Sequence, residues 1–219
     1  MSLPALTLGS DAPTGALIWL HGLGADGNDF APVVPILDRP DLRVILPHAP
    51  VRPVTVNGGA PCRSWYDIRF MAPGPGRESA DDIRASAEAV RSLVQEQRNA
   101  GIPAHRIALV GFSQGGAMAL HVALRWPERL AAVVALSTYL VLEDTLDDER
   151  SATTNGLPAF FGHGTFDPVV SPGRGQSAAD RLAPHLDVRW HDYPMDHSVC
   201  IDEILDLRDF IAETIPPLP

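Results

Sequence analysis

A hydroxyl stands between two glycines in the stretch G-F-S-Q-G at residues 111–115. An apolar run typical of a strand precedes this stretch, and small residues that suit a helix follow it. A serine at a sharp strand-to-helix turn has a strained backbone, and the residues two positions away must be small so that strand and helix can approach each other. We therefore interpret Gly111 and Gly115 as elbow glycines and Ser113 as a candidate nucleophile. The alternative is a glycine-rich turn with only a structural role.

A serine hydroxyl is a weak nucleophile at neutral pH, so it needs a histidine base and usually a carboxylate that orients the histidine. In α/β-hydrolase folds the acid and then the histidine follow the serine, on loops after later strands. His197 lies in such a loop, before the last predicted helix. His121 falls inside the helix after the serine, His185 at the end of a helix and His191 inside a strand, so these three are expected to be structural. His197 is the candidate base.

The candidate acid is Asp167, which lies in a loop with glycine and proline just after a predicted strand. Asp196 is the alternative, because it directly precedes His197. Adjacent side chains usually point in different directions, so Asp196 is poorly placed to meet the His197 ring. We therefore favour Asp167. His163, which precedes the same loop, is expected to be a buried, hydrogen-bonded residue that shapes the turn.

Acyl transfer by a serine also needs two backbone N–H groups that bind the oxyanion, one of them from the residue after the nucleophile. Gln114 supplies the first. The stretch H-G-L-G at residues 21–24 follows an apolar strand, and we expect its Leu23 to supply the second. An ordinary glycine-rich turn is the alternative for this stretch. Because backbone amides stabilise the developing charge, neither a metal nor an organic cofactor is expected.

The elements that must position these residues alternate as strands and helices, which predicts an α/β domain over residues 1–219 with a mostly parallel central sheet. The predicted helices follow Ser79, Ser113 and Ser171 and start from Ser198, and the first of them ends at Gly101. The stretches 47–77 and 143–156 are predicted to be irregular loops. The predicted strands are Leu3–Leu8, which would be antiparallel, and Ala16–Leu20, Arg43–Leu46, Ile107–Gly111, Ala131–Leu136, Pro158–Gly162 and Val188–Tyr193.

Composition narrows the class of protein. All 17 basic residues are arginines and the formal net charge is −10, so no basic stripe exists for a nucleic acid. No stretch approaches the ~18 apolar residues of a membrane span, and the first residues do not resemble a signal peptide. We therefore expect no stable membrane insertion and a cytoplasmic location. Cys62 and Cys200 are too few and too isolated for a disulfide scaffold or a zinc site, and we expect free thiols.

The chain resembles the family of small α/β-hydrolases that comprises carboxylesterases, lysophospholipases and acyl-protein thioesterases. The stretches that carry the resemblance extend from about Leu20 to Cys200: LHGLGADGNDF, LPHAP, VTVNGG with SWYDI, GFSQGGAMAL, HGTFDPVV and YPMDHSVC. It implies an α/β-hydrolase fold with helices on both faces of the sheet and no large cap domain. The resemblance implies that Ser113, Asp167 and His197 form the catalytic triad and that Leu23 and Gln114 are the oxyanion donors. It also places Trp65 beside an acyl pocket that Leu23 lines as well. Where the family often has a small glycine, this chain has Thr138, which would narrow the pocket floor.

The expected function is hydrolysis of carboxylic esters or thioesters with short to medium acyl chains. Acyl-protein thioesterase or lysophospholipase activity by the same mechanism is an alternative, and so is a non-catalytic binding protein that keeps only the fold. A peptidase is less favoured, because no cap domain is present to select peptides. Apolar residues of the Trp65 loop, including Val54, Val56, Ile68, Phe70 and Met71, would line an acyl groove or pack on the core. Such apolar surface, together with the family resemblance, also makes a homodimer an expectation.

Overall fold

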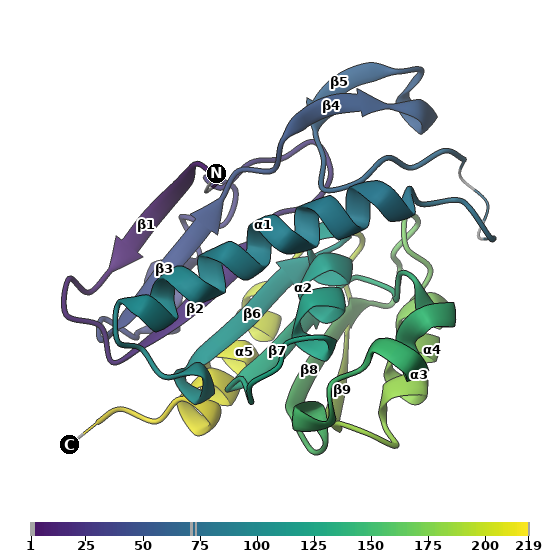
Figure 1. Cartoon of the computed structure of the whole chain (residues 1–219). Helices are drawn as coiled ribbons and strands as arrows, with labels where there is room; N and C mark the ends of the chain where they lie inside the picture. Colours follow the sequence, from purple (N-terminus) through teal and green to yellow (C-terminus); the bar gives the residue numbers. More distant parts are fainter. Residues whose placement is uncertain (1–2, 71, 73, 219) are drawn as a thin grey trace.

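Seven strands form the central sheet of the computed structural model, which describes residues 3–70, 72 and 74–218 (Figure 1). Their spatial order is β1-β3-β2-β6-β7-β8-β9, and only β1 is antiparallel to its neighbour. The prediction of a mostly parallel sheet is confirmed. The strands are β1 (Ala5–Gly9), β2 (Gly15–Leu20), β3 (Leu42–Pro47), β6 (Ile107–Phe112), β7 (Ala132–Leu136), β8 (Pro158–Gly164) and β9 (Asp187–Tyr193).

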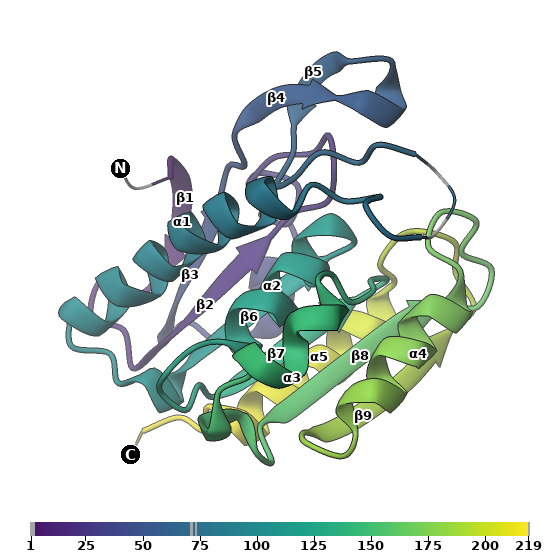
Figure 2. The same cartoon turned by 45° about the vertical axis from the view of Figure 1, so that its right-hand side comes forward.

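Helices cover both faces of this sheet, as Figures 1 and 2 show. Side chains alternate along each strand, so Ile18 of β2 faces one apolar core while Leu17 and Trp19 face the other. The first core is closed by α1 (Ala80–Asn99), α2 (Gln114–Leu124), α3 (Leu146–Glu149) and α4 (Pro172–Leu182), and the second by α5 (Ile201–Thr214). Short 3₁₀ turns are η1 (Val34–Leu37), η2 (Thr55–Asn57), η3 (Ala104–Arg106), η4 (Glu143–Thr145) and η5 (Ala152–Thr154).

Helix α1 follows the sequence rules closely. The Ser79 side chain caps its start by accepting a hydrogen bond from the Asp82 amide at 3.4 Å. Ile83, Val90 and Val94 are buried on its apolar face, as their spacing predicts. Beyond its end Gly101 has φ +94°, a conformation that favours glycine.

The stretch 47–77, expected to be irregular, contains a two-stranded antiparallel ribbon of β4 (Val51–Val54) and β5 (Ala60–Arg63). This ribbon lies outside the main sheet, above the N-terminal half of α1 in Figure 1. The stretch 143–156 likewise contains η4, α3 and η5. Within the described residues, no helix is both long and apolar enough to cross a bilayer. Cys62 and Cys200 are free, as predicted.

Glu203 of α5 is a buried acid inside the second core. Its side chain is 0% exposed, and within the described residues neither carboxylate oxygen has a hydrogen-bond partner. A Cβ at Gly162 of β8 would collide with Oε1, so the glycine makes room for the carboxyl group. Burial, with the nearby charge of Asp206, raises the pKa of Glu203 to about 8. The buried group is therefore the neutral acid at pH 7.

The free energy of unfolding of the natural chain should fall as the pH rises, because Glu203 is buried. We expect Glu203→Met to remove this pH dependence. The unfolded carboxyl, whose ordinary pKa is 4.5, ionises freely above that pH, whereas the folded one resists ionisation up to pH about 8. The free energy of unfolding of the natural chain therefore falls by about 3 kcal/mol between pH 5 and pH 8. Urea unfolding at several pH values measures this slope. Asp202→Asn changes an exposed carboxylate on the same helix and is the control, so its unfolding free energy should fall with pH as in the natural chain. If the unfolding free energy of Glu203→Met falls with pH just as steeply, Glu203 is not the group responsible.

Candidate active site

Ser113 occupies the turn between β6 and α2 with φ +53° and ψ −120°, a strained conformation for a residue other than glycine. A Cβ at Gly111 would collide with the backbone of Gly115. A Cβ at Gly115 would collide with the carbonyl oxygens of Leu20 and His21. Both positions thus require glycine, and the close approach of strand and helix holds Ser113 at the carboxyl edge of the sheet.

The structure brings Ser113, His197 and Asp167 together from three loops. His197 Nε2 lies 2.9 Å from Ser113 Oγ, and His197 Nδ1 lies 2.7 Å from Asp167 Oδ2. A carboxylate only accepts hydrogen bonds, so Nδ1 carries the proton and Nε2 is free to accept one from the serine. This arrangement is a proton relay suited to acyl transfer.

Asp167 is itself firmly held. Its side chain is 0% exposed, and its Oδ1 accepts hydrogen bonds from the amides of Val169 at 2.8 Å and Val170 at 2.9 Å. His163 is buried beside it and lies 2.9 Å from the Val170 carbonyl through Nε2, as expected of a residue that shapes the turn. Asp196, in contrast, is exposed, and in the described structure no hydrogen bond or ion pair joins its carboxylate to His197.

Leu23 and Gln114 line the same cavity as Ser113. Within the described residues neither amide donates a hydrogen bond to another residue. The loop of Leu23 is fixed from both sides, because the Gly24 amide donates to the Arg63 carbonyl and the Trp65 indole donates to the His21 carbonyl, each at 2.9 Å. Two fixed amides beside Ser113 would meet the requirement for an oxyanion hole.

The His21 ring connects this loop to the chain after β3. Its Nδ1 lies 2.7 Å from the Gly22 carbonyl, and its Nε2 lies 3.1 Å from the Ala49 amide. Because the carbonyl must accept and the amide must donate, the ring is the neutral Nδ1–H tautomer. Burial lowers the pKa of His21, which favours this neutral form.

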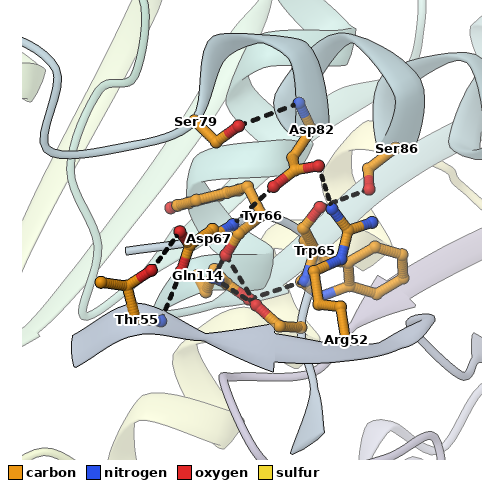
Figure 3. Close-up of polar contacts among 10 residues, drawn as sticks. Arg52, Thr55, Trp65, Tyr66, Asp67, Ser79, Asp82, Ser86 and Gln114 are labelled. Atoms are coloured by element: carbon orange, nitrogen blue, oxygen red, sulfur yellow. Dashed lines mark hydrogen bonds and ion pairs between the residues drawn. The ribbon is translucent and has the colours of Figure 1, made fainter. Parts of the chain in front are cut away.

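Residues 51–68, which we call the arm, are fastened to the nucleophile elbow and to α1 (Figure 3). The Gln114 side chain accepts from the Trp65 amide at 2.8 Å and donates to the Tyr66 carbonyl at 2.7 Å. On the other side, Asp82 of α1 accepts from the Asp67 amide at 3.0 Å. Sequence reasoning missed the role of the Gln114 side chain. The available signal was an amide side chain at the start of a helix whose next six residues are all small or apolar.

Two residues expected in the pocket lie elsewhere. Trp65 is fully buried in the core, where it supports the Leu23 loop, and it does not line the cavity. Thr138 is buried, and its hydroxyl donates to the Ser113 carbonyl at 2.6 Å, which keeps the side chain off the cavity wall. Met71 lies outside the described residues. Leu23 does line the cavity.

The cavity above Ser113 has a volume of about 310 Å³, near the lower end of the usual range for small-molecule sites. Val56 and Ile68 of the arm line it, whereas Val54 is packed in the core and Phe70 is exposed outside it. The full lining is Gly22, Leu23, Ala25, Asp29, Val56, Asn57, Ile68, Arg77, Phe112, Ser113, Gln114, Tyr139, Val169, Val170 and His197.

Comparison with known proteins agrees with this geometry. A model of the phospholipase/carboxylesterase family matches residues 2–215. A relative from Cryptococcus neoformans named acyl-protein thioesterase 1 is 37% identical over 224 residues, which cover 94% of each chain. A relative from Mycosarcoma maydis with the same name is 38% identical over 222 residues, which cover 93% of this chain and 92% of the relative.

Solved structures of other proteins also share the fold of this chain. The crystal structure of acyl-protein thioesterase 2 from Zea mays superposes with a TM-score of 0.84 at 26% identity and covers 97% of this chain and 99% of that one. The structure of esterase PE8, at 24% identity and a TM-score of 0.85, shares the fold and covers 98% of this chain and 100% of that one. The chain therefore has the α/β-hydrolase fold and belongs to the phospholipase/carboxylesterase family.

Proposed function

We propose that the protein hydrolyses carboxylic thioesters and oxygen esters through a covalent acyl-enzyme on Ser113. The observation that carries this proposal is the continuous hydrogen-bonded chain from Ser113 Oγ through His197 to the buried carboxylate of Asp167. A non-catalytic protein of this fold would have no need for such a relay. Family membership supports the same chemistry.

In the proposed mechanism Ser113 Oγ attacks the acyl carbon while His197 Nε2 takes its proton. The carbonyl oxygen becomes an oxyanion and accepts hydrogen bonds from the amides of Leu23 and Gln114, of which one is typically worth about 2.7–4 kcal/mol in the transition state. His197 then protonates the departing thiol or alcohol. Water attacks the acyl-enzyme in the same way and releases the carboxylic acid, while Asp167 orients and stabilises the imidazolium throughout.

For the substrate, we propose short to medium acyl chains, because the cavity is small and partly apolar. Thioesters of acylated proteins are the leading physiological candidate, and the two relatives named acyl-protein thioesterase 1 support it. A lysophospholipase activity is the second candidate and follows from the name of the matching family.

Labelling with a fluorophosphonate tests the proposal directly. We expect one covalent adduct per chain, located at Ser113 by mass spectrometry of the digested protein, together with hydrolysis of p-nitrophenyl butyrate and of S-butyryl-N-acetylcysteamine. The adduct should not form on chain unfolded in urea, because the nucleophile is activated only by the assembled relay. Folded protein that takes no label and hydrolyses neither substrate would support the non-catalytic alternative.

Three broader properties are proposed with this activity. We propose that residues 1–219 form one domain, which the single seven-stranded sheet with helices on both faces supports. A cytoplasmic location is supported by the two free thiols. Assembly into a homodimer is supported by large apolar side chains at the surface, such as Phe166 with 71% of its area exposed.

A further inference from the structure

Thr138 follows β7 at the same edge of the sheet as Ser113, but it lies outside the lining of the cavity. Its side chain is buried, and its hydroxyl donates a hydrogen bond of 2.6 Å to the Ser113 carbonyl. That carbonyl also accepts from the Ala117 amide at 3.1 Å, which is the first backbone hydrogen bond of α2. The hydrogen bond from Thr138 is therefore an addition to those that the helix itself requires.

The Ser113 carbonyl and the Gln114 amide belong to one peptide unit. This unit is planar, and in the trans form its C=O and N–H groups point in opposite directions. A side chain that fixes the direction of the Ser113 carbonyl therefore also fixes the direction of the Gln114 N–H. A hydrogen bond to the carbonyl oxygen polarises the peptide unit as well, which makes the N–H a stronger donor.

The other proposed oxyanion donor is held in the same manner. His21 Nδ1 donates to the Gly22 carbonyl at 2.7 Å, and this carbonyl shares its peptide unit with the Leu23 amide. Each of the two amides thus has a buried side chain hydrogen-bonded to the carbonyl of its own peptide unit. This parallel indicates that the direction of both amides is fixed by side chains that lie behind them.

Thr138 is itself held in place by its surroundings. The Ser137 amide before it donates to the Gly162 carbonyl at 2.8 Å, which attaches the chain after β7 to β8. Gly116 of α2 leaves room for the threonine, because a Cβ at Gly116 would lie 2.8 Å from Thr138 Cβ and 2.9 Å from Cγ2. A β-branched side chain in such a narrow space has few rotamers, so its hydroxyl stays directed at the Ser113 carbonyl.

We propose that Thr138 is a positioning residue that directs the Gln114 amide toward the oxyanion and strengthens it as a donor. The inference rests on the proposed hydrolase function and adds to it a residue that acts through a peptide unit without touching the substrate. Negative charge develops on the acyl oxygen only in the transition states of acylation and deacylation. The contribution of Thr138 should therefore appear in kcat and not in KM.

Thr138→Val tests this inference, because valine has nearly the same shape as threonine and lacks only the hydroxyl. We expect kcat and kcat/KM for S-butyryl-N-acetylcysteamine to fall together by roughly three- to thirtyfold, less than the roughly hundred- to thousandfold loss when an oxyanion donor is removed outright. Thr138→Ser keeps the hydroxyl and should retain most of the natural rate. Thr138→Ala, which also lacks the hydroxyl, replaces the valine variant if that variant does not fold.

Propyl trifluoromethyl ketone, an analogue of the butyryl thioester, reports on the oxyanion directly. Ser113 Oγ adds to its carbonyl carbon, His197 takes the serine proton, and the carbonyl oxygen becomes an oxyanion that resembles the transition state. The inhibition constant of the ketone should therefore rise in Thr138→Val by the factor by which kcat/KM falls. The end point of fluorophosphonate labelling counts the competent sites, so that partial unfolding is not mistaken for a slower reaction.

Thr154→Val is the matched control. Thr154 is a buried threonine in η5, before the start of β8 and thus at the edge of the sheet opposite to Ser113. Its hydroxyl donates to the Ser151 carbonyl at 2.7 Å and accepts from Arg150 Nη1 at 3.0 Å. The substitution therefore removes the same kind of hydrogen bond and lowers the unfolding midpoint in urea, but kcat and inhibition by the ketone should not change.

The outcomes separate this inference from the proposed function. If the natural chain hydrolyses no thioester and takes no fluorophosphonate label, the proposed function fails. If the natural chain is active and Thr138→Val equals Thr154→Val in kcat and in inhibition by the ketone, or differs only in KM, Thr138 has no positioning role. Equal losses in Thr138→Val and Thr138→Ser would assign the effect to packing and also overturn the inference. A joint loss of kcat and ketone affinity that serine restores supports it.

Discussion

Replacing Ser113 by alanine is expected to lower kcat for ester and thioester hydrolysis by about a millionfold. The substitution removes the oxygen that attacks the acyl carbon, and without it His197 has no proton to accept. What remains is the small acceleration that the oxyanion amides and substrate binding give to attack by water. Stopped assays with S-butyryl-N-acetylcysteamine over long incubations measure both rates.

The fold of Ser113→Ala should survive, because the elbow does not depend on the hydroxyl. The Ser113 amide donates to the Leu136 carbonyl at 2.8 Å, and the Ser113 carbonyl accepts from Thr138, so both backbone hydrogen bonds remain. The unfolding midpoint in urea should therefore change little. An unfolded variant would make the loss of activity uninformative, and the fluorophosphonate adduct at Ser113 then decides the assignment.

Ser137 provides an unusually close control. It is a buried serine with φ +46°, it follows β7 just as Ser113 follows β6, and its hydroxyl has no hydrogen-bond partner in the described structure. Ser137→Ala removes the same atom from the same kind of backbone, and kcat should stay within a few fold. Equal losses in the two variants, or more than about 1% of the natural rate in Ser113→Ala, would refute Ser113 as the nucleophile.

The sequence predicts the elbow and the meeting of Ser113, Asp167 and His197, because both follow from simple rules of strand and helix packing. Gly111 is required by its contact with Gly115 in the next element, whereas Gly115 is required by the carbonyl oxygens of Leu20 and His21 at the end of the neighbouring strand β2. Asp167 and His197 lie on loops after consecutive strands β8 and β9, and parallel strands bring such loops to one edge of the sheet.

The cavity wall could not be predicted in this way, because it depends on how the arm folds back over the sheet. The family resemblance implies that Trp65 lies beside the pocket, yet its indole donates a hydrogen bond to the His21 carbonyl. The arm contains strands of only four residues each, which are too short for alternation to be recognised. Arg77 gave no sequence signal at all, since a single arginine in a glycine- and proline-rich stretch is usually exposed.

Replacing Asp167 by asparagine is expected to lower kcat by about ten-thousandfold at neutral pH. The asparagine oxygen can still accept from the amides of Val169 and Val170, so its amide nitrogen is directed at His197 Nδ1. That nitrogen donates, and Nδ1 must then accept, which moves the ring proton to Nε2. A protonated Nε2 donates toward Ser113 Oγ and cannot remove its proton. The variant should therefore fold normally and yet react slowly with both thioester and fluorophosphonate.

Asp196→Asn is the matched control for this prediction, since it makes the same chemical change one residue before His197. Asp196 is exposed, and water screens its charge, so we expect kcat to change less than threefold. The comparison shows which of the two candidate acids, Asp167 or Asp196, orients the His197 ring. A greater loss in Asp196→Asn than in Asp167→Asn would mean that the 2.7 Å contact between Asp167 and His197 is not the one that sets the tautomer, and the relay would have to be reassigned.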